Sequence, residues 1–143
     1  MRRPYIPVAT ERLVRERAKH RCEYCQSPAQ ITSAPFCLDH IHPHALGGAS
    51  TQENLALSCP FCNSSKGDRT AAIEVQSGET VTLFHPRTQI WSEHFEWSDD
   101  GLMILARTPI GLVTIAALGL NRIELCNLRR ALIRFGVHPP TND

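Results

Sequence analysis

Two Cys-x-x-Cys pairs constrain this chain more than any other feature of its sequence. Cys22 and Cys25 form the first pair, and Cys59 and Cys62 form the second. Each pair can offer two thiolates to one metal ion, and four thiolates at this spacing suit a tetrahedral structural Zn²⁺. We therefore predict that zinc closes the chain between the two pairs into one compact unit.

The length and the cysteine content indicate how many domains to expect and in which compartment the protein works. The chain has 143 residues, of which 42% are hydrophobic, so we predict a single domain over residues 1–143. No apolar stretch resembles a signal peptide or reaches the length of a bilayer span, so we expect a soluble, cytoplasmic protein with no membrane partner. Because the cytoplasm keeps thiols reduced, we expect the six cysteines to bind metal or remain free thiols and not to form disulfides. Cys37 and Cys126, outside the pairs, are expected to act as small buried hydrophobes.

Charge is distributed unevenly, although the net charge is only +1. Residues 1–21 form a basic arm with seven arginine and lysine side chains against two glutamates, and residues 122–134 are also arginine-rich. Basic ends around a metal-bound centre can flank a polyanion, whereas each arginine taken alone is better explained as part of a solvated helix face. Only the clustering of these basic residues therefore favours a nucleic acid as partner.

Local patterns predict helices and short strands around the cysteines. We expect a helix over residues 10–20, with Thr10 as its N-cap and Leu13, Val14 and Ala18 as its apolar stripe. Strands are expected at 36–40 and 54–58, separated by a loop with Gly47 and Gly48, and a helix over 60–72 follows despite Gly67.

The rest of the chain is predicted to form an extension of short strands followed by helices. Strands are expected at 81–84, 90–95 and 102–106, and the Asp100-Gly101 step marks a hairpin. Two helices follow, the first capped by Thr108 before Pro109 and the second by Asn121, with Ile123 and Ile133 among its core residues. The expected fold is α+β, with a core at residues 20–72, an N-terminal helix before it, and an extension at 81–135 containing a β-hairpin and helices.

One ordered set of motifs resembles the HNH endonucleases that have a ββα-metal core and a four-cysteine zinc site. The resemblance covers about residues 20–70, and residues 84–95 are similar to the extension that follows this core in a bacterial branch of the family. The set comprises Cys22-x-x-Cys25, Asp39-His40-Ile41-His42-Pro43, Gly47-Gly48, Glu53-Asn54-Leu55 and Cys59-x-x-Cys62-Asn63, with Lys66 after it.

The resemblance implies a role for each polar residue of these motifs. His40 would be the general base that deprotonates the attacking water, and Asn54 would hydrogen-bond across the loop and hold His40 in orientation. Asp39 and Asn63 would hold a catalytic divalent cation, with Mg²⁺ expected because asparagine at position 63 supplies a hard oxygen ligand. Because side chains alternate along a strand, Asp39 and His40 reach one site only if the strand ends or twists there, which Pro43 favours.

Other residues keep more than one interpretation. The resemblance implies that Lys66 contacts DNA phosphates from the helix; Arg69 either does the same or covers an exposed helix face. His42 is open between a phosphate contact, a metal ligand and a turn residue, whereas His44 is expected to be a turn residue. We expect the other histidines to be ordinary surface or core residues and both tryptophans to pack in the core; these are His20, His85, His94, His138, Trp91 and Trp97.

The sequence favours a metal-dependent endonuclease that hydrolyses DNA, and RNA is the alternative substrate. The alternative is a zinc-containing nucleic-acid-binding module without catalysis. A redox protein that uses Cys-x-x-Cys is weaker, because no βαβ pattern surrounds the pairs. A bacterial or phage origin is expected, and a homodimer would suit the cutting of two strands, although no segment identifies an interface.

Overall fold

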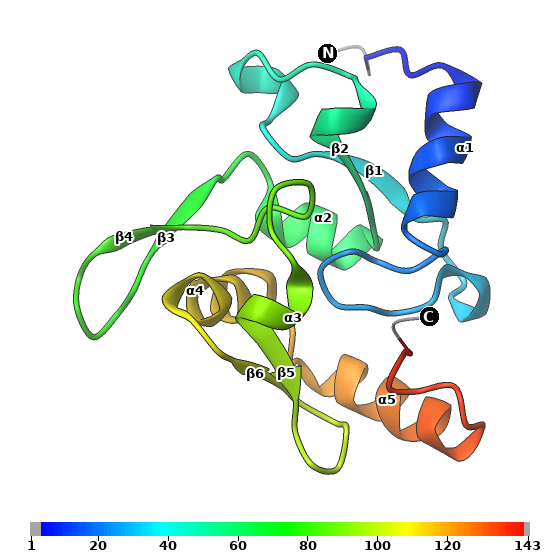
Figure 1. The fold of residues 1–143 in the computed structure, drawn as a ribbon, viewed down its shortest axis with the longest axis vertical. Helices are drawn as coiled ribbons and strands as arrows, with labels where there is room; N and C mark the ends of the chain where they lie inside the picture. The colour runs from blue at the N-terminus through cyan, green and yellow to red at the C-terminus, as the bar shows by residue number, and fades with distance from the viewer. Residues whose placement is uncertain (1–3, 142–143) are drawn as a thin grey trace. The chain divides into compact units, whose positions relative to one another are not determined.

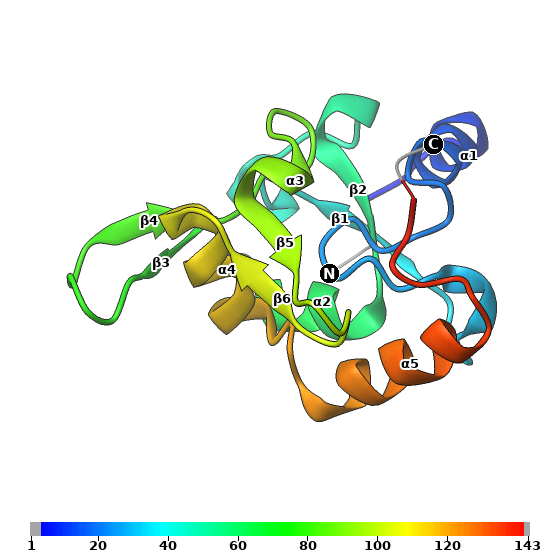
Figure 2. The same cartoon turned by 60° about the horizontal axis from the view of Figure 1, so that its bottom comes forward.

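The structure is a computed structural model that describes residues 4–141, and the chain divides into two compact units. The first unit contains the chain up to Thr70 together with the returning segment His85–Gln89, and the second contains Ala71–Phe84 and the chain from Ile90 onward. The prediction that all of it forms one domain stays a prediction. The mixture of helices and small antiparallel sheets confirms the α+β class (Figures 1 and 2).

The first unit begins with helix α1 (Val8–Arg17), drawn in blue in Figure 1. It starts two residues before the predicted cap, with Pro7 in the capping position, so the role given to Thr10 is wrong. Val14 is its buried residue, whereas Leu13 is 41% exposed. After the helix, Lys19 and His20 take positive φ values of 55° and 57°, which reverse the chain into the first cysteine pair.

The predicted order of strand, loop, strand and helix is present between the cysteine pairs. Strand β1 (Cys37–His40) pairs antiparallel with β2 (Leu55–Ser58), and Asp39 lies opposite Ala56. All four residues of β2 are buried, so this strand forms the floor of the unit. Its end leads directly into helix α2 (Pro60–Lys66).

Helix α2 is shorter than the sequence predicted. Cys59 caps it, since its Sγ accepts a hydrogen bond from the Cys62 amide, and Pro60 stands at the first helical position. The helix ends at Gly67, whose φ of 55° is incompatible with continuation. The expected helix through residue 72 is therefore wrong, and Ala71–Ile73 forms strand β3 instead.

The segment His85–Gln89 returns to the first unit after β3 and β4 (Thr80–Thr82). The Arg87 guanidinium forms an ion pair with Glu23, between the first two cysteines, and both side chains are 12% exposed. The other carboxylate oxygen of Glu23 accepts a hydrogen bond from the Leu57 amide at 2.8 Å. The return segment is thereby fixed to the cysteine-bearing turn.

The second unit is built on two hairpins and two helices. Strands β3 and β4 form one hairpin, and β5 (Phe95–Trp97) pairs with β6 (Ile104–Ala106) across the predicted Asp100-Gly101 turn. The strand predicted over 90–95 is wrong, because Trp91–His94 forms the single helical turn α3. That turn lets the Trp91 ring contact the rings of Phe95 and Trp97, with centroid separations of 5.0 and 5.5 Å.

Helices α4 (Pro109–Leu118) and α5 (Ile123–Arg134) complete the second unit. Thr108 caps α4 as predicted, whereas Asn121 does not cap α5, because its side chain bonds both backbone groups of Ile104. Ile123 and Ile133 are 66% and 37% exposed, so their predicted place in the core is wrong. Among residues 4–141, no single helix is long and apolar enough to cross a membrane; only α4 and α5 together, bent by 102°, reach that length and composition.

Candidate metal centre and active site

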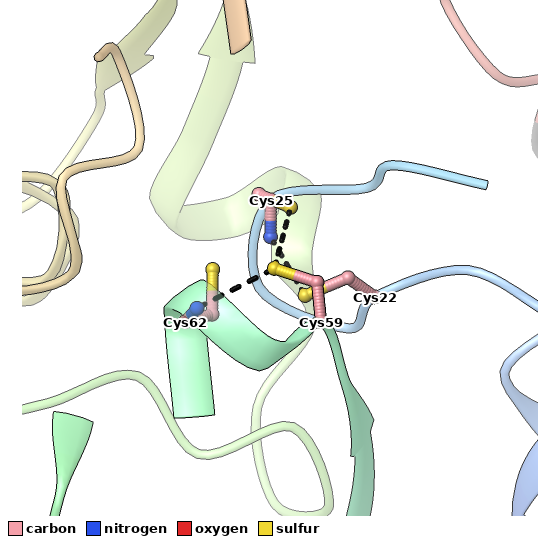
Figure 3. Close-up of side chains that lie close together, drawn as sticks. All are labelled: Cys22, Cys25, Cys59 and Cys62. Carbon is pink, nitrogen blue, oxygen red and sulfur yellow. Dashed lines mark hydrogen bonds between the residues drawn. The ribbon is translucent and has the colours of Figure 1, made fainter. Parts of the chain in front are cut away.

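The four paired cysteines converge on one point in the first unit (Figure 3). Their Sγ atoms all lie within 4.8 Å of one another, and all four residues are buried. A tetrahedral zinc site with Zn–S bonds of about 2.3 Å needs sulfur atoms about 3.8 Å apart, and the Cys25 and Cys59 sulfurs are 3.8 Å apart. The cluster therefore fits the predicted structural Zn²⁺.

Backbone amides assist the thiols in both pairs. The Cys25 amide donates to the Cys22 Sγ at 3.5 Å, and the Cys62 amide donates to the Cys59 Sγ at 3.4 Å. Hydrogen bonds from Cys22 and its neighbours lower the pKa of Cys59, whereas burial raises the pKa of Cys22. A dication would overcome that burial cost and hold all four sulfurs as thiolates.

Three of the predicted catalytic residues line one open pocket of about 640 Å³ in the first unit. Asp39 and His40 come from the end of β1, and Asn63 comes from α2. The strand ends at His40, so two adjacent residues reach the same pocket. The pocket also extends to α1 and the loop after β1; further lining residues are Ile6, Glu11, Arg15, Phe36, His44 and Asp68.

His40 is half-buried and has a defined partner. Its Nε2 lies 2.9 Å from the Ser50 hydroxyl. Burial lowers the pKa of His40, the neighbouring His44 lowers it further, and the charge of Asp39 opposes both. The imidazole is thus favoured in its neutral form, which a general base requires.

The Asn54 side chain closes the loop that follows β1. Its Oδ1 accepts from the His42 amide at 2.8 Å, and its Nδ2 donates to the carbonyls of His42 and Ala49 at 3.0 and 2.8 Å. Gly48 completes the closure, because a Cβ there would lie 1.8 Å from the His42 carbonyl oxygen. The amide therefore spans the loop next to His40, where the family resemblance expected it.

The two other histidines of the motif differ in position. His42 is exposed, and its Nε2 lies 3.2 Å from the Leu46 carbonyl oxygen, a contact within the turn. His44, expected as a turn residue, lines the pocket with its ring 5.6 Å from the His40 ring. This proximity could not be predicted from local patterns, because it depends on the 3-10 turn at His44–Leu46.

Lys66 occupies a different place from the one expected. Its side chain is only 2% exposed, and its ammonium lies 3.3 Å from an oxygen of Asp39 and 3.2 Å from the carbonyls of both His40 and Ile41. In this structure the ammonium faces these acceptors and not the surface, and the expected DNA contact of Lys66 stays a prediction. Arg69 remains exposed, with its guanidinium 2.6 Å from the Ser65 carbonyl.

Asp39 is buried beneath this lysine and has a second donor. It is 4% exposed, and its Oδ2 accepts the Tyr24 hydroxyl at 2.7 Å. Burial raises the pKa of Asp39, whereas the charge of Lys66 and the Tyr24 hydrogen bond lower it. Tyr24 and Ser50 were not among the predicted site residues, because both meet the site only through tertiary contacts.

Part of the predicted basic arm serves the interior of the unit. The guanidinium groups of Arg15, Arg17 and Arg21 donate to the carbonyls of Phe36, Leu55 and Gln26 at 3.3, 2.9 and 2.9 Å. These bonds tie α1 and the cysteine turn to neighbouring segments. Arg15 and Arg21 are half-buried, whereas Arg17 is exposed, as expected for a solvated helix face. Arg12 and Lys19 are exposed, and Arg2 and Arg3 lie outside the described residues.

The remaining histidines and tryptophans have mainly structural contacts. His94 Nδ1 lies 2.7 Å from the Thr108 hydroxyl, and His138 Nε2 lies 2.8 Å from the Gly101 carbonyl oxygen. His85 accepts backbone amides at its Nδ1, whereas His20 is exposed. Trp97 packs edge-on against His138, which agrees with the expected packing role.

Comparison with known proteins agrees with this geometry. Residues 22–69 match the family described as HNH endonuclease, which confirms the predicted resemblance for this segment. The family supports a nuclease function in general, with a nucleic acid as the kind of partner.

Two curated relatives also match the chain. The CRISPR-associated endonuclease Cas9 of Corynebacterium diphtheriae is 38% identical over 81 residues, which cover 53% of this chain and 7% of that protein. The Septu protein PtuB of Bacillus mycoides is 26% identical over 151 residues, which cover 87% of this chain and 51% of that protein. The chain therefore spans about half or less of these relatives. No solved structure matches it.

Proposed function

We propose that this protein is a metal-dependent endonuclease that hydrolyses phosphodiester bonds in DNA. The observation that carries the proposal is the meeting of Asp39, His40 and Asn63 around one open pocket, inside a segment of the HNH endonuclease family. The name of the Cas9 relative, an endonuclease, is consistent with it.

His40 is the general base in this proposal. The Ser50 hydroxyl holds Nε2 and so fixes the ring, which leaves Nδ1 to take the proton of the attacking water. Asn54 holds the loop that follows His40 and thereby limits the movement of the ring. Its role is positioning, because its contacts are to backbone groups of the loop.

Asp39 and Asn63 are the proposed ligands of the hydrolytic cation. A carboxylate and an amide oxygen form a hard donor set that suits Mg²⁺ or a similar divalent cation. The two oxygens of Asp39 offer about four lone-pair sites, so the bonds to Tyr24 and Lys66 leave room for a further ligand contact. The chemistry such a cation supplies is stabilisation of charge on the scissile phosphate and on the leaving 3′ oxygen.

The nucleic-acid contacts are proposed for exposed basic groups of the first unit. Arg12 and Lys19 on the first helix and its end, Arg69 after α2, and His42 in the loop can reach phosphates from the surface. Because these contacts are to backbone phosphates, they would position the strand and carry no base specificity.

One observation favours a second candidate, a zinc-containing binding module without catalysis. Lys66 already neutralises the buried Asp39 carboxylate, so the site can exist as a closed ion pair with no cation. In that case the exposed basic groups would bind a nucleic acid, and His40 would be dispensable.

Cleavage of supercoiled plasmid decides between the two candidates. Wild type, His40→Ala and the control His20→Asn are compared at equal zinc content with Mg²⁺, Mn²⁺ or EDTA. His20 is an exposed histidine of positive φ that lies outside the pocket lining, and asparagine tolerates that backbone conformation. Metal-dependent nicking by wild type and His20→Asn, but not by His40→Ala, supports the nuclease.

Two other outcomes of the plasmid assay would contradict the proposal. Folded wild type that leaves plasmid and single-stranded RNA intact in every metal, yet shifts either on a gel, supports the binding module. Equal cleavage by wild type and His40→Ala would remove His40 as the base.

A further inference from the structure

The most deeply buried ion pair of the described residues lies directly beneath the proposed site. Lys66 and Asp39 are 2% and 4% exposed, and the ammonium is 3.4 and 3.3 Å from the two carboxylate oxygens. The carbonyls of His40 and Ile41, each at 3.2 Å, are the other acceptors. A lysine ammonium has three N–H groups, so this cage satisfies all of them.

The position of Lys66 links the two elements that carry the site. It is the last residue of α2, the helix that contains Cys62 and Asn63, and its acceptors are at the end of β1. A single side chain therefore joins the cysteine-anchored helix both to the Asp39 carboxylate and to the main chain of His40.

Stability alone is a weak explanation for such a pair. Burial of two charges costs about as much as their attraction returns, and apolar replacements of buried pairs often leave a protein equally stable. The two carbonyl contacts add something that an apolar side chain could not provide, because they fix the direction of the backbone at His40 and Ile41. The Tyr24 hydroxyl donates a further hydrogen bond to Oδ2 of the same carboxylate.

We propose that Lys66 is a positioning residue, whose ammonium holds the Asp39 carboxylate and the His40 main chain in the arrangement that hydrolysis needs, without touching the nucleic acid. The proposal rests on the proposed nuclease function for its catalytic part. The anchoring of β1 by Lys66 can be tested without any cleavage.

Lysine NMR tests the anchoring first. The chain has two lysines, Lys19 and Lys66, and Lys19 is exposed. In ¹⁵N-lysine-labelled protein, one ammonium resonance should be protected from solvent exchange, and it should vanish in Lys66→Met but persist in Lys19→Met. Amide exchange at Ile41, whose N–H bonds the Asn54 carbonyl, should become at least tenfold faster in Lys66→Met. The absence of a protected ammonium in wild type, or unchanged exchange at Ile41, would overturn the proposal.

Kinetics then separate positioning from phosphate contact. At equal zinc content, Lys66→Met should lower the cleavage rate at saturating DNA at least tenfold, with the KM for DNA and its salt dependence unchanged. The matched variant Arg69→Met, at an exposed position after the same helix, should raise KM and reduce the salt dependence. A Lys66→Met variant that behaves like Arg69→Met would show that Lys66 binds phosphate.

A double variant covers the case in which Lys66→Met does not fold. Asp39→Asn/Lys66→Met, which removes both charges, should still fold and show a measurable Tm, because the unpaired buried carboxylate is gone. A double variant that fails to fold like Lys66→Met would overturn the pairing, as would strictly additive effects on Tm where both single variants fold. If wild type proves inactive, the proposed nuclease fails, while NMR and this cycle still decide the anchoring.

Discussion

The cysteine cluster and the His40 pocket lie in the same small unit but differ in how far their side chains are closed off from solvent. The cluster has four sulfurs within 4.8 Å of one another, all buried, so a bound ion would have no position left for a substrate. The pocket is open, and His40, the proposed base, is half-buried in it. Closed sites of this kind support a fold, whereas open sites leave room for water and substrate.

The two regions are connected through α2. Cys59 and Cys62 stand at its start, and Asn63 follows directly. The cluster therefore determines where the helix begins, and the helix determines where Asn63 and Lys66 lie. Damage to the cluster should reach the pocket, but damage in the pocket need not reach the cluster.

The largest effect is expected from the cluster. Cys59→Ser should lose zinc and unfold the first unit, because the binding free energy of a structural zinc, of the order of 10 kcal/mol, is folding free energy. Zinc content and far-ultraviolet circular dichroism measure this. Cys37→Ser, at a half-buried cysteine outside the cluster, is the matched control and should keep its zinc. Equal zinc loss in both variants would contradict a four-cysteine site.

The next effect tests the independence of the pocket. His40→Ala should lower cleavage by about 10² to 10⁴, the usual contribution of a general base. Zinc content and the thermal transition should change little, because the ring is half-exposed and its hydrogen-bond partner is a hydroxyl near the surface. An aggregated or zinc-free variant would mean that His40 supports the fold.

A smaller effect is expected at Asn54, which belongs to the loop rather than to the chemistry. Asn54→Ala loses three hydrogen bonds to backbone groups and should lower the free energy of unfolding by about 1–3 kcal/mol. Cleavage should fall as the loop loosens. Asn54→Asp keeps the acceptor for the His42 amide but sets a carboxylate oxygen against the carbonyls of His42 and Ala49, so urea unfolding should show it no more stable than Asn54→Ala. A fully stable Asn54→Ala would remove the loop-closing role.

The smallest effect concerns pH. In the proposed mechanism the neutral imidazole is the active form, and burial lowers the pKa of His40 below its ordinary value of 6.5. The cleavage rate should therefore stay high as pH falls and reach half its maximum below pH 6.5. Rates at saturating DNA between pH 5 and 8, at constant ionic strength, measure this. A half-point above pH 6.5 would mean that His40 is not the group whose protonation limits the rate.

The cysteine cluster could be predicted from the sequence because its spacing is local. Cys-x-x-Cys needs only a tight turn to bring two sulfurs together, and the ordered motifs between the pairs then identified the ββα unit. Thr108 before Pro109 and the Asp100-Gly101 hairpin were predictable for the same reason, since capping and turn chemistry depend on neighbouring residues.

Lys66 and Ser50 could not be predicted in the same way. A lysine in a polar stretch is normally solvated, and its buried partner Asp39 lies 27 positions earlier in the sequence. Ser50 contacts His40 only because the loop folds back. The error at residues 90–95 has a similar cause, because aromatic residues favour strands until tertiary packing selects a helical turn.

The return segment His85–Gln89 makes the first unit discontinuous in sequence. The family match ends at residue 69, yet the Arg87 ion pair with Glu23 belongs to the same compact unit. A graft of residues 22–69 into another protein would leave the Glu23 carboxylate beside the cysteine turn without its guanidinium. Modular exchange of this unit would have to include the return segment.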